Sequence, residues 1–101
     1  MVLIMVTSIF PPNTGLQVQQ RYKAIQQKFP LPAFVQSKRV GVRWVREGMK
    51  AVAIYEVERG KVTEALHFVY EYEAEFASIE GYSNEIETFL TVDEFPSLRE
   101  R

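Results

Sequence analysis

One histidine, several carboxylates and a group of tyrosines are the side chains of this 101-residue sequence that could do chemistry. There is no cysteine, which excludes a disulfide framework, a thiolate metal site and a cysteine nucleophile. At 100° per residue, the apolar stripe of the helix predicted around His67 turns this histidine to the far side, beside Glu71. We therefore predict a solvent-exposed histidine with a glutamate neighbour four residues on, and neither a metal ligand nor a base.

The acidic residues do not form a better cluster. Glu71, Glu73 and Glu75 lie on the same predicted helix, and acids in that position are typical of a solvated face. With one histidine and no cysteine, carboxylates would be the only strong metal ligands. Serine chemistry lacks a base with an orienting partner, and no glycine-rich phosphate loop is present. We expect no metal and no cofactor.

Aromatic residues suggest a different kind of site, a cleft that binds a small molecule. Such clefts are mostly apolar with a few polar groups, here a threonine, an arginine and tyrosine hydroxyls. The candidate ligand-binding residues are Thr7, Tyr22, Arg43, Trp44, Tyr55 and Tyr72, with Phe29 and Phe76 adding apolar surface. The alternative is that these rings are plain core, which a domain of this size needs. The sequence leaves both interpretations open.

Hydrophobic periodicity predicts the elements that would position these side chains. Residues 2–10 favour a strand, with β-branched residues throughout and two prolines at the end. The remaining elements are a helix from Asn13 or Thr14 to about Phe29, strands at 34–46 and 49–58 around a Glu47-Gly48 turn, a helix from Gly60 to about Ile79 with Gly81 as its C-cap, and a strand at 83–92. We predict one domain over residues 1–92 and a charged tail at 93–101.

This β-α-β-β-α-β order predicts an α+β, ferredoxin-like sandwich. The first and third strands would be central in an antiparallel four-stranded sheet, with both helices on one face. Both central strands nevertheless carry apolar side chains on both faces of the sheet. In the first strand, Leu3 and Met5 point to one face, and Ile4 and Val6 point to the other. Something must therefore cover the open face of the sheet. The sequence offers no third helix, so we predict a second copy of the chain.

The distribution of charge supports a homodimer. Residues 1–61 carry ten basic and three acidic residues, whereas residues 62–101 carry two basic and ten acidic residues. The basic second strand and the acidic fourth strand would form opposite edges of the sheet, so a basic edge could meet the partner's acidic edge twice. The alternative is that these charges are solvated and only protect the edges.

The sequence resembles the dimeric α/β-barrel superfamily over about residues 2–92. The resemblance lies in the element order, in the apolar first strand that runs into a proline-rich turn, and in the end strand GYSNEIETFL, and it is closest to the small uncharacterised members. It implies two ferredoxin-like sheets that form a shared barrel. Members include cofactor-independent monooxygenases, haem-degrading enzymes, muconolactone isomerases and stress-responsive proteins. Haem-degrading members use an Asn in the first strand and a Trp and a His on the second helix, whereas this chain has Thr7 in the strand and no Trp in that helix.

We expect a homodimeric small-molecule-binding or regulatory module; the alternative is a cofactor-independent monooxygenase- or isomerase-like enzyme acting on an aromatic metabolite. Nucleic-acid binding is disfavoured because the third strand offers small alanines where stacking rings would be needed. The opening apolar run is too short for a membrane helix, ends at two prolines and has no preceding basic residue, so we expect neither a signal peptide nor a membrane segment. A cytoplasmic location is compatible with the absence of cysteine.

Overall fold

The computed structural model describes residues 1–91 and confirms the predicted order of elements. The strands are β1 (Val2–Phe10), β2 (Val35–Val45), β3 (Gly48–Val57) and β4 (Ser83–Leu90), and the helices are α1 (Gly15–Lys28) and α2 (Val62–Ala74). A single 3₁₀ turn precedes each helix, at Pro12–Thr14 and at Arg59–Lys61.

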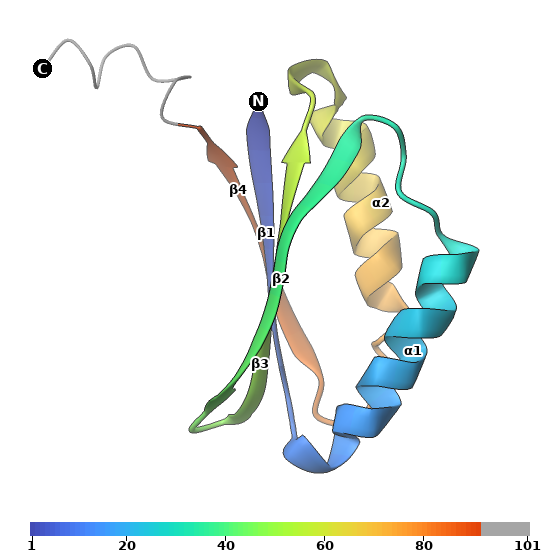
Figure 1. Ribbon diagram of the computed structural model, residues 1–101, viewed down its shortest axis with the longest axis vertical. Coiled ribbons are helices and arrows are strands. Elements are labelled where there is room, and N and C mark those ends of the chain that lie inside the picture. The colour runs from blue at the N-terminus through green and yellow to red at the C-terminus, as the bar shows by residue number, and fades with distance from the viewer. Residues whose placement is uncertain (92–101) are drawn as a thin grey trace, which may run out of the picture.

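The sheet has the order β2-β3-β1-β4, and its neighbouring strands are antiparallel. As predicted, β1 and β3 are central, and both helices lie on one face of the sheet (Figure 1). The α+β, ferredoxin-like architecture is therefore confirmed.

Several local details differ from the sequence predictions. α2 ends at Ala74, and residues 75–80 continue as tighter turns in which backbone N–H groups bond three residues back, as from Phe76 to Glu73 (3.0 Å). Three-residue spacing keeps Phe76 and Ile79 on the same buried side. Gly81, with φ of 80°, therefore closes this turn segment and is not the C-cap of α2. The β2–β3 turn lies one residue earlier than predicted, at 46–47, with Gly48 already in β3.

The other two differences concern a helix cap and the last strand. Thr14 stands at the N-cap of α1, but its hydroxyl donates to the carbonyl of Pro11 (2.7 Å) and does not cap the helix. β4 ends at Leu90, earlier than predicted, because Leu90 pairs with Val2 at the very start of β1. The predicted tail at 93–101 lies outside the described residues.

Alternate residues of β1 build the core. Every second side chain from Val2 to Phe10 is buried against the helices, including Ser8. The predicted inward stripe of α2 supplies the opposing surface through Ala65, Val69 and Tyr72. A strict alternation along β1 thus fixes which face of the sheet the helices cover.

The other face of the sheet is apolar at its centre and is not covered by a helix of the described chain. Leu3, Met5 and Ile9 of β1 are half-buried there, beside Val52 and Ile54 of β3.

Within residues 1–91, no helix is long and apolar enough to cross a membrane.

Candidate ligand-binding pocket

A cavity of about 470 Å³ lies between the inner face of the sheet and the helices. Its floor lies close to the backbone of the sheet because Ala51 and Ala53, on the inner face of β3, end at Cβ. Larger side chains surround this floor: Val6 from β1, Tyr55 from β3 and Tyr22 from α1. The cavity therefore exists where the central strands carry small residues beneath the helices.

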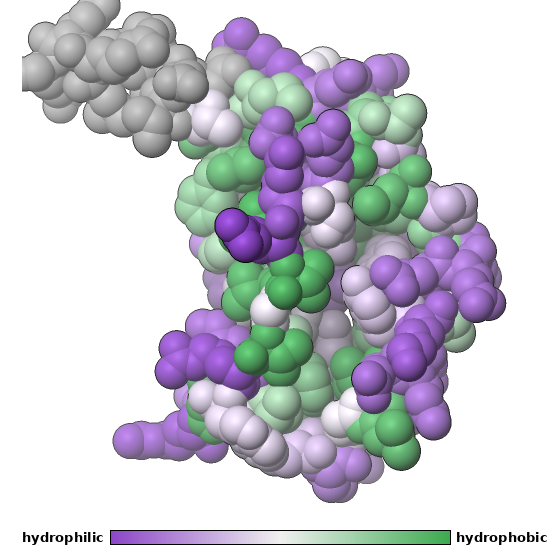
Figure 2. Space-filling model, in the orientation of Figure 1, coloured by the Kyte–Doolittle hydropathy of each residue, from purple (hydrophilic) through white to green (hydrophobic). Residues whose placement is uncertain are grey.

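The cavity opens at the β2 edge of the sheet. Val40 and Val42 line it from β2, and these side chains are 55% and 59% exposed. Figure 2 shows a hydrophobic band over this strand beside a hollow that faces α1. An apolar molecule could therefore enter past an apolar rim.

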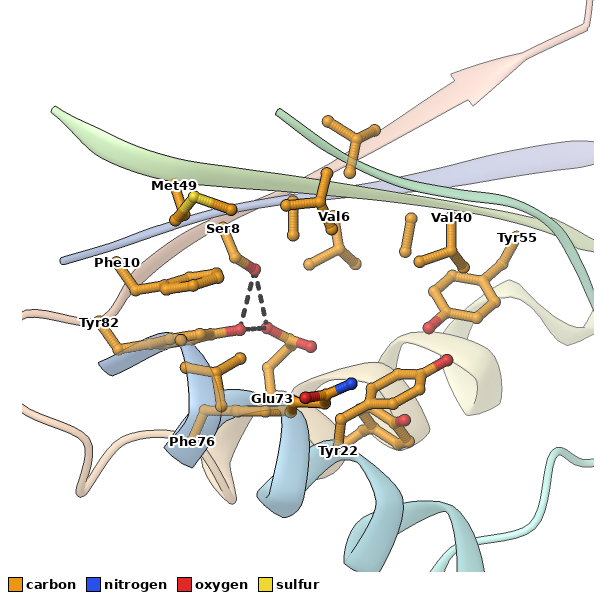
Figure 3. A pocket seen from close by; sticks show the side chains of 18 residues that line it. Val6, Ser8, Phe10, Tyr22, Val40, Met49, Tyr55, Glu73, Phe76 and Tyr82 are labelled. Carbon is orange, nitrogen blue, oxygen red and sulfur yellow. Dashed lines mark hydrogen bonds between the residues drawn. The ribbon is translucent and has the colours of Figure 1, made fainter. Parts of the chain in front are cut away.

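Three oxygen atoms form a hydrogen-bonded triangle at one end of the pocket (Figure 3). The Tyr82 hydroxyl lies 2.9 Å from Oε1 of Glu73 and 2.9 Å from Oγ of Ser8, and the Ser8 hydroxyl lies 3.4 Å from the same Oε1. Ser8 comes from β1, Glu73 from α2 and Tyr82 from the segment between α2 and β4. The triangle thus ties three elements together.

The environment of Glu73 is unusual for a glutamate. Its side chain is buried, and burial raises the pKa of the carboxyl group because the charged form loses its hydration. The hydrogen bonds from Tyr82 and Ser8 act in the opposite direction, but burial is the larger effect. The carboxyl group therefore holds its proton to higher pH than an exposed glutamate does.

Aromatic stacking holds Tyr82 in place. Its ring lies between those of Phe10, at 6.0 Å, and Phe76, at 5.0 Å, and is nearly parallel to both. These parallel rings form the wall at the Glu73 end of the pocket (Figure 3). Burial and the nearby Glu73 raise the pKa of the Tyr82 hydroxyl, so it is a neutral hydrogen-bond donor.

Further tyrosine hydroxyls lie at the opposite end. Tyr22 and Tyr55 direct their hydroxyls toward each other there (Figure 3), and the ring of Tyr72 meets that of Tyr22 edge-on at 6.4 Å. Burial raises the pKa of Tyr55 to about 12, and it also raises that of Tyr72. This end of the pocket therefore offers neutral hydroxyls in an aromatic setting.

The structure brings together half of the predicted ligand-binding residues. Tyr22, Tyr55 and Tyr72 line the pocket, whereas Thr7, Arg43 and Trp44 do not. Thr7 has the wrong parity along β1, since it pairs with Val52 and Glu85 and so lies on the open face.

The two β2 candidates also lie outside this pocket. Arg43 pairs with Lys50 and therefore also belongs to the open face. Trp44 shares the inner face with Val42, but it lies near the hairpin end of β2, is 67% exposed and does not line the pocket. Ser8, one residue from Thr7, is the polar β1 side chain that actually reaches the pocket.

Glu73 does not lie on the solvated helix face that its charge predicts. It was expected on a solvated helix face with Glu71 and Glu75, and it is instead buried at 8% exposure. The other two fit the expectation better: Glu71 is exposed, and Glu75 forms an ion pair with Lys28 at 3.3 Å. The available signal was spacing, because Glu73 follows the buried Val69 by four residues and therefore belongs to the inward stripe.

The single histidine and the acidic side chains do not form a metal site within residues 1–91. His67 is exposed on α2, as expected. Within residues 1–91, no group of three His, Cys, Asp or Glu side chains lies together in a way that could hold a metal ion.

Comparison with known proteins identifies the fold. No family model matches the chain, and no curated protein is similar to it in sequence. Among solved structures, it is similar to a candidate antibiotic biosynthesis monooxygenase from Deinococcus radiodurans (12% identity, TM-score 0.62, 90% of this chain and 92% of that one). It is also similar to a conserved protein from Methanosarcina mazei Go1 (10% identity, TM-score 0.54, covering 88% and 91%).

A third similar structure is SnoaB from Streptomyces nogalater, a cofactor-independent oxygenase (14% identity, TM-score 0.50, covering 94% and 97%). The chain therefore has a ferredoxin-like fold similar to those of these solved structures, and the ferredoxin-like domain implied by the resemblance in sequence is confirmed. At these identities the likeness concerns the fold.

Proposed function

We propose that this protein binds an apolar, ring-containing small molecule in the pocket between helices and sheet. The observation that carries the proposal is the open cavity of about 470 Å³, with aromatic walls and a few polar groups at its two ends. The aromatic side chains pack around this space and leave it open, which favours a pocket over the alternative of a plain core.

A filling substitution tests this proposal. Ala53 lies on the pocket floor with a small side chain, so Ala53→Leu would occupy the space where a ring would lie. We expect methylnaphthalene to perturb the NMR signals of Tyr55 and Val6 in the wild-type protein and to lose this effect in Ala53→Leu. Gly60→Ala is the matched control, because a Cβ at Gly60 meets nothing within 4 Å. Absence of any perturbation in the wild-type protein would contradict the proposal.

We also propose that two copies pair through the open face of the sheet. The centre of that face is apolar, and at about 25 cal/mol per Å² the burial of such surface supplies affinity. The basic residues Arg39 and Arg43 lie on this face at the β2 edge, and the acidic residues Glu85 and Glu87 lie on it at the β4 edge.

The geometry of the face defines how a second copy would dock. A two-fold axis parallel to the strands places β2 of one copy over β4 of its partner, and basic groups then meet acidic groups twice. An axis perpendicular to the strands would instead place β2 over β2 and oppose like charges. Sedimentation at micromolar concentration tests the proposal, and a single-chain mass there would contradict it.

We also propose that the protein is located in the cytoplasm, with which its cysteine-free sequence is compatible.

Catalysis without a cofactor is the second candidate function, and the environment of Glu73 favours it. A carboxyl group whose pKa is raised by burial in an apolar pocket is suited to take up a proton from a bound substrate. An aryl ketone such as tetralone would then exchange its α-hydrogen for deuterium in heavy water faster with the protein present. Loss of this acceleration in Glu73→Gln would support catalysis, and absence of acceleration in the wild-type protein would contradict it.

A further inference from the structure

Glu73 carries the only carboxyl group among the side chains that line the pocket in the described chain. The other lining residues are apolar, hydroxyl-bearing or amide side chains, and no lysine, arginine or histidine of residues 1–91 is among them. A buried carboxylate is normally paired with a cation, because its desolvation is otherwise uncompensated. The pocket therefore contains an acid without a countercharge.

The hydrogen bonds to Glu73 leave one of its oxygens available. Tyr82 and Ser8 both approach Oε1, and no hydrogen bond within residues 1–91 reaches Oε2. Because no fully buried side-chain oxygen of the described chain lacks a hydrogen-bond partner, Oε2 is at least partly accessible. In Figure 3 the carboxyl group extends from the triangle toward the open part of the pocket. This oxygen is therefore positioned to meet a ligand.

The surroundings of this oxygen are suited to a cation of a particular kind. Aromatic rings from Tyr22, Tyr55, Tyr72 and Phe76 line the same cavity, and ring faces attract organic cations most strongly when water is excluded. An apolar frame would occupy the remaining space. A small hydrated metal ion would gain little here, since one carboxylate and a few hydroxyls could not replace its hydration shell.

We propose that the pocket selects an apolar ligand carrying one positive charge, a tertiary or quaternary amine on a ring-containing frame, with the charged nitrogen beside Oε2 of Glu73. This inference rests on the proposed binding function and specifies its ligand class. A neutral ligand of the same shape would displace water from Glu73 without supplying a countercharge. It would therefore bind with the carboxyl group protonated, whereas the cation binds with it ionised.

Three probes of matched shape test the charge preference by calorimetry. They are naphthylmethyl-trimethylammonium, its neutral isostere neopentylnaphthalene and the anion naphthylacetate. At mildly alkaline pH we expect the cation to bind about tenfold or more tightly than the neutral isostere, which corresponds to about 1.4 kcal/mol. Naphthylacetate should bind most weakly. Equal or tighter binding of the neutral isostere would overturn the charge preference and leave the proposed pocket function intact, whereas failure of all three probes to bind would overturn both.

A charge-neutral variant assigns the preference to Glu73. Glu73→Gln keeps the shape and can still hydrogen-bond to Tyr82 and Ser8, so we expect it to retain the neutral probe and lose the preference for the cation. Glu71→Gln, which removes the same charge from an exposed position of α2, is the matched control and should keep the preference for the cation. Persistence of the preference in Glu73→Gln would overturn the assignment.

Proton release gives a second readout. Ser8 from β1 and Tyr82 hydrogen-bond to Glu73, and the other titratable side chains that line the pocket within residues 1–91 are Tyr22 from α1, Tyr55 from β3 and Tyr72 from α2. Binding of the cation favours the ionised carboxylate, so at mildly acidic pH it should release protons. Heats measured in two buffers with different ionisation enthalpies would detect this release. Absence of release throughout the titration range of Glu73 would overturn the placement of the charged nitrogen beside Oε2.

Discussion

The Tyr82 hydroxyl lies 2.9 Å from Oε1 of Glu73, a residue nine positions earlier in the chain. This contact joins the end of α2 to the segment that leads into β4, and it places the one carboxyl side chain that lines the pocket within residues 1–91 against a ring held between Phe10 and Phe76. The stability of the fold and the ionisation of the pocket are therefore linked through one hydrogen bond.

Removing this hydroxyl should weaken the fold. Tyr82→Phe retains the stacked ring but takes a donor from a buried carboxyl group, which typically costs about 1–3 kcal/mol. Urea denaturation at mildly alkaline pH and fixed protein concentration measures the loss. Tyr70→Phe, at an exposed position of α2, is the control and should change stability little. NMR titration of Glu73 should also show a higher carboxyl pKa in Tyr82→Phe, because the lost hydrogen bond lowers that pKa.

Glu73 should make the protein less stable as the pH rises. Burial raises its pKa in the folded state above the ordinary value of 4.5, so the folded state binds more protons than the unfolded state between the two values. The stabilising contribution is therefore complete below 4.5 and is lost as pH rises through the folded-state pKa. Every tenfold increase in the proton affinity of the folded carboxyl group corresponds to about 1.4 kcal/mol of this contribution.

Replacing the carboxyl group should remove this dependence. Denaturation across this pH range should show that the free energy of unfolding falls with pH in the wild-type protein and is flatter in Glu73→Gln. Glu71→Gln should follow the wild-type curve. A parallel decline in Glu73→Gln would show that another group carries the pH dependence.

A charge at the centre of the open face should separate the proposed dimer. Ile54 pairs with Met5 of β1 and Arg39 of β2, so it lies in the middle of the sheet. Ile54→Glu would bury a charged side chain between the two apolar sheet faces, and we expect the sedimenting mass to fall from two chains to one. Leu16→Glu, at a position on α1 that is 67% exposed, should leave the mass unchanged. A dimer that survives Ile54→Glu would place the interface elsewhere.

Gly48, the first residue of β3 after the β2–β3 turn, should not tolerate a side chain. Gly48 has φ of 135°, and a Cβ there would lie 2.5 Å from the carbonyl oxygen of Phe10. Gly48→Ala combines backbone strain with a clash against backbone, so we expect a loss of at least about 1–3 kcal/mol in thermal or chemical denaturation. Gly60→Ala has neither problem and should be nearly neutral. Equal stability of the two variants would contradict this explanation.

The sequence determined the elements and their arrangement. The apolar stripe of α2, the alternation along β1 and the proline-rich boundary after Phe10 are local patterns, and they predict elements because helices repeat every 3.6 residues and strands every two. Short connections then restrict six such elements to few layouts. Tyr22, Tyr55 and Tyr72 could be placed in the pocket for the same reason, since each lies on the inward side of its element.

Only the tertiary structure decided which polar side chains reach the pocket. Both faces of β1 are apolar, so the sequence could not show whether Thr7 or Ser8 would face the helices, and a shift of one residue exchanges the two faces. The charge of Glu73 alone predicts that its side chain is exposed to solvent. It is buried because α2 packs its inward stripe against β1, where Ser8 and Tyr82 supply hydrogen bonds from positions 65 and nine residues away. Contacts of that separation arise only when the chain folds.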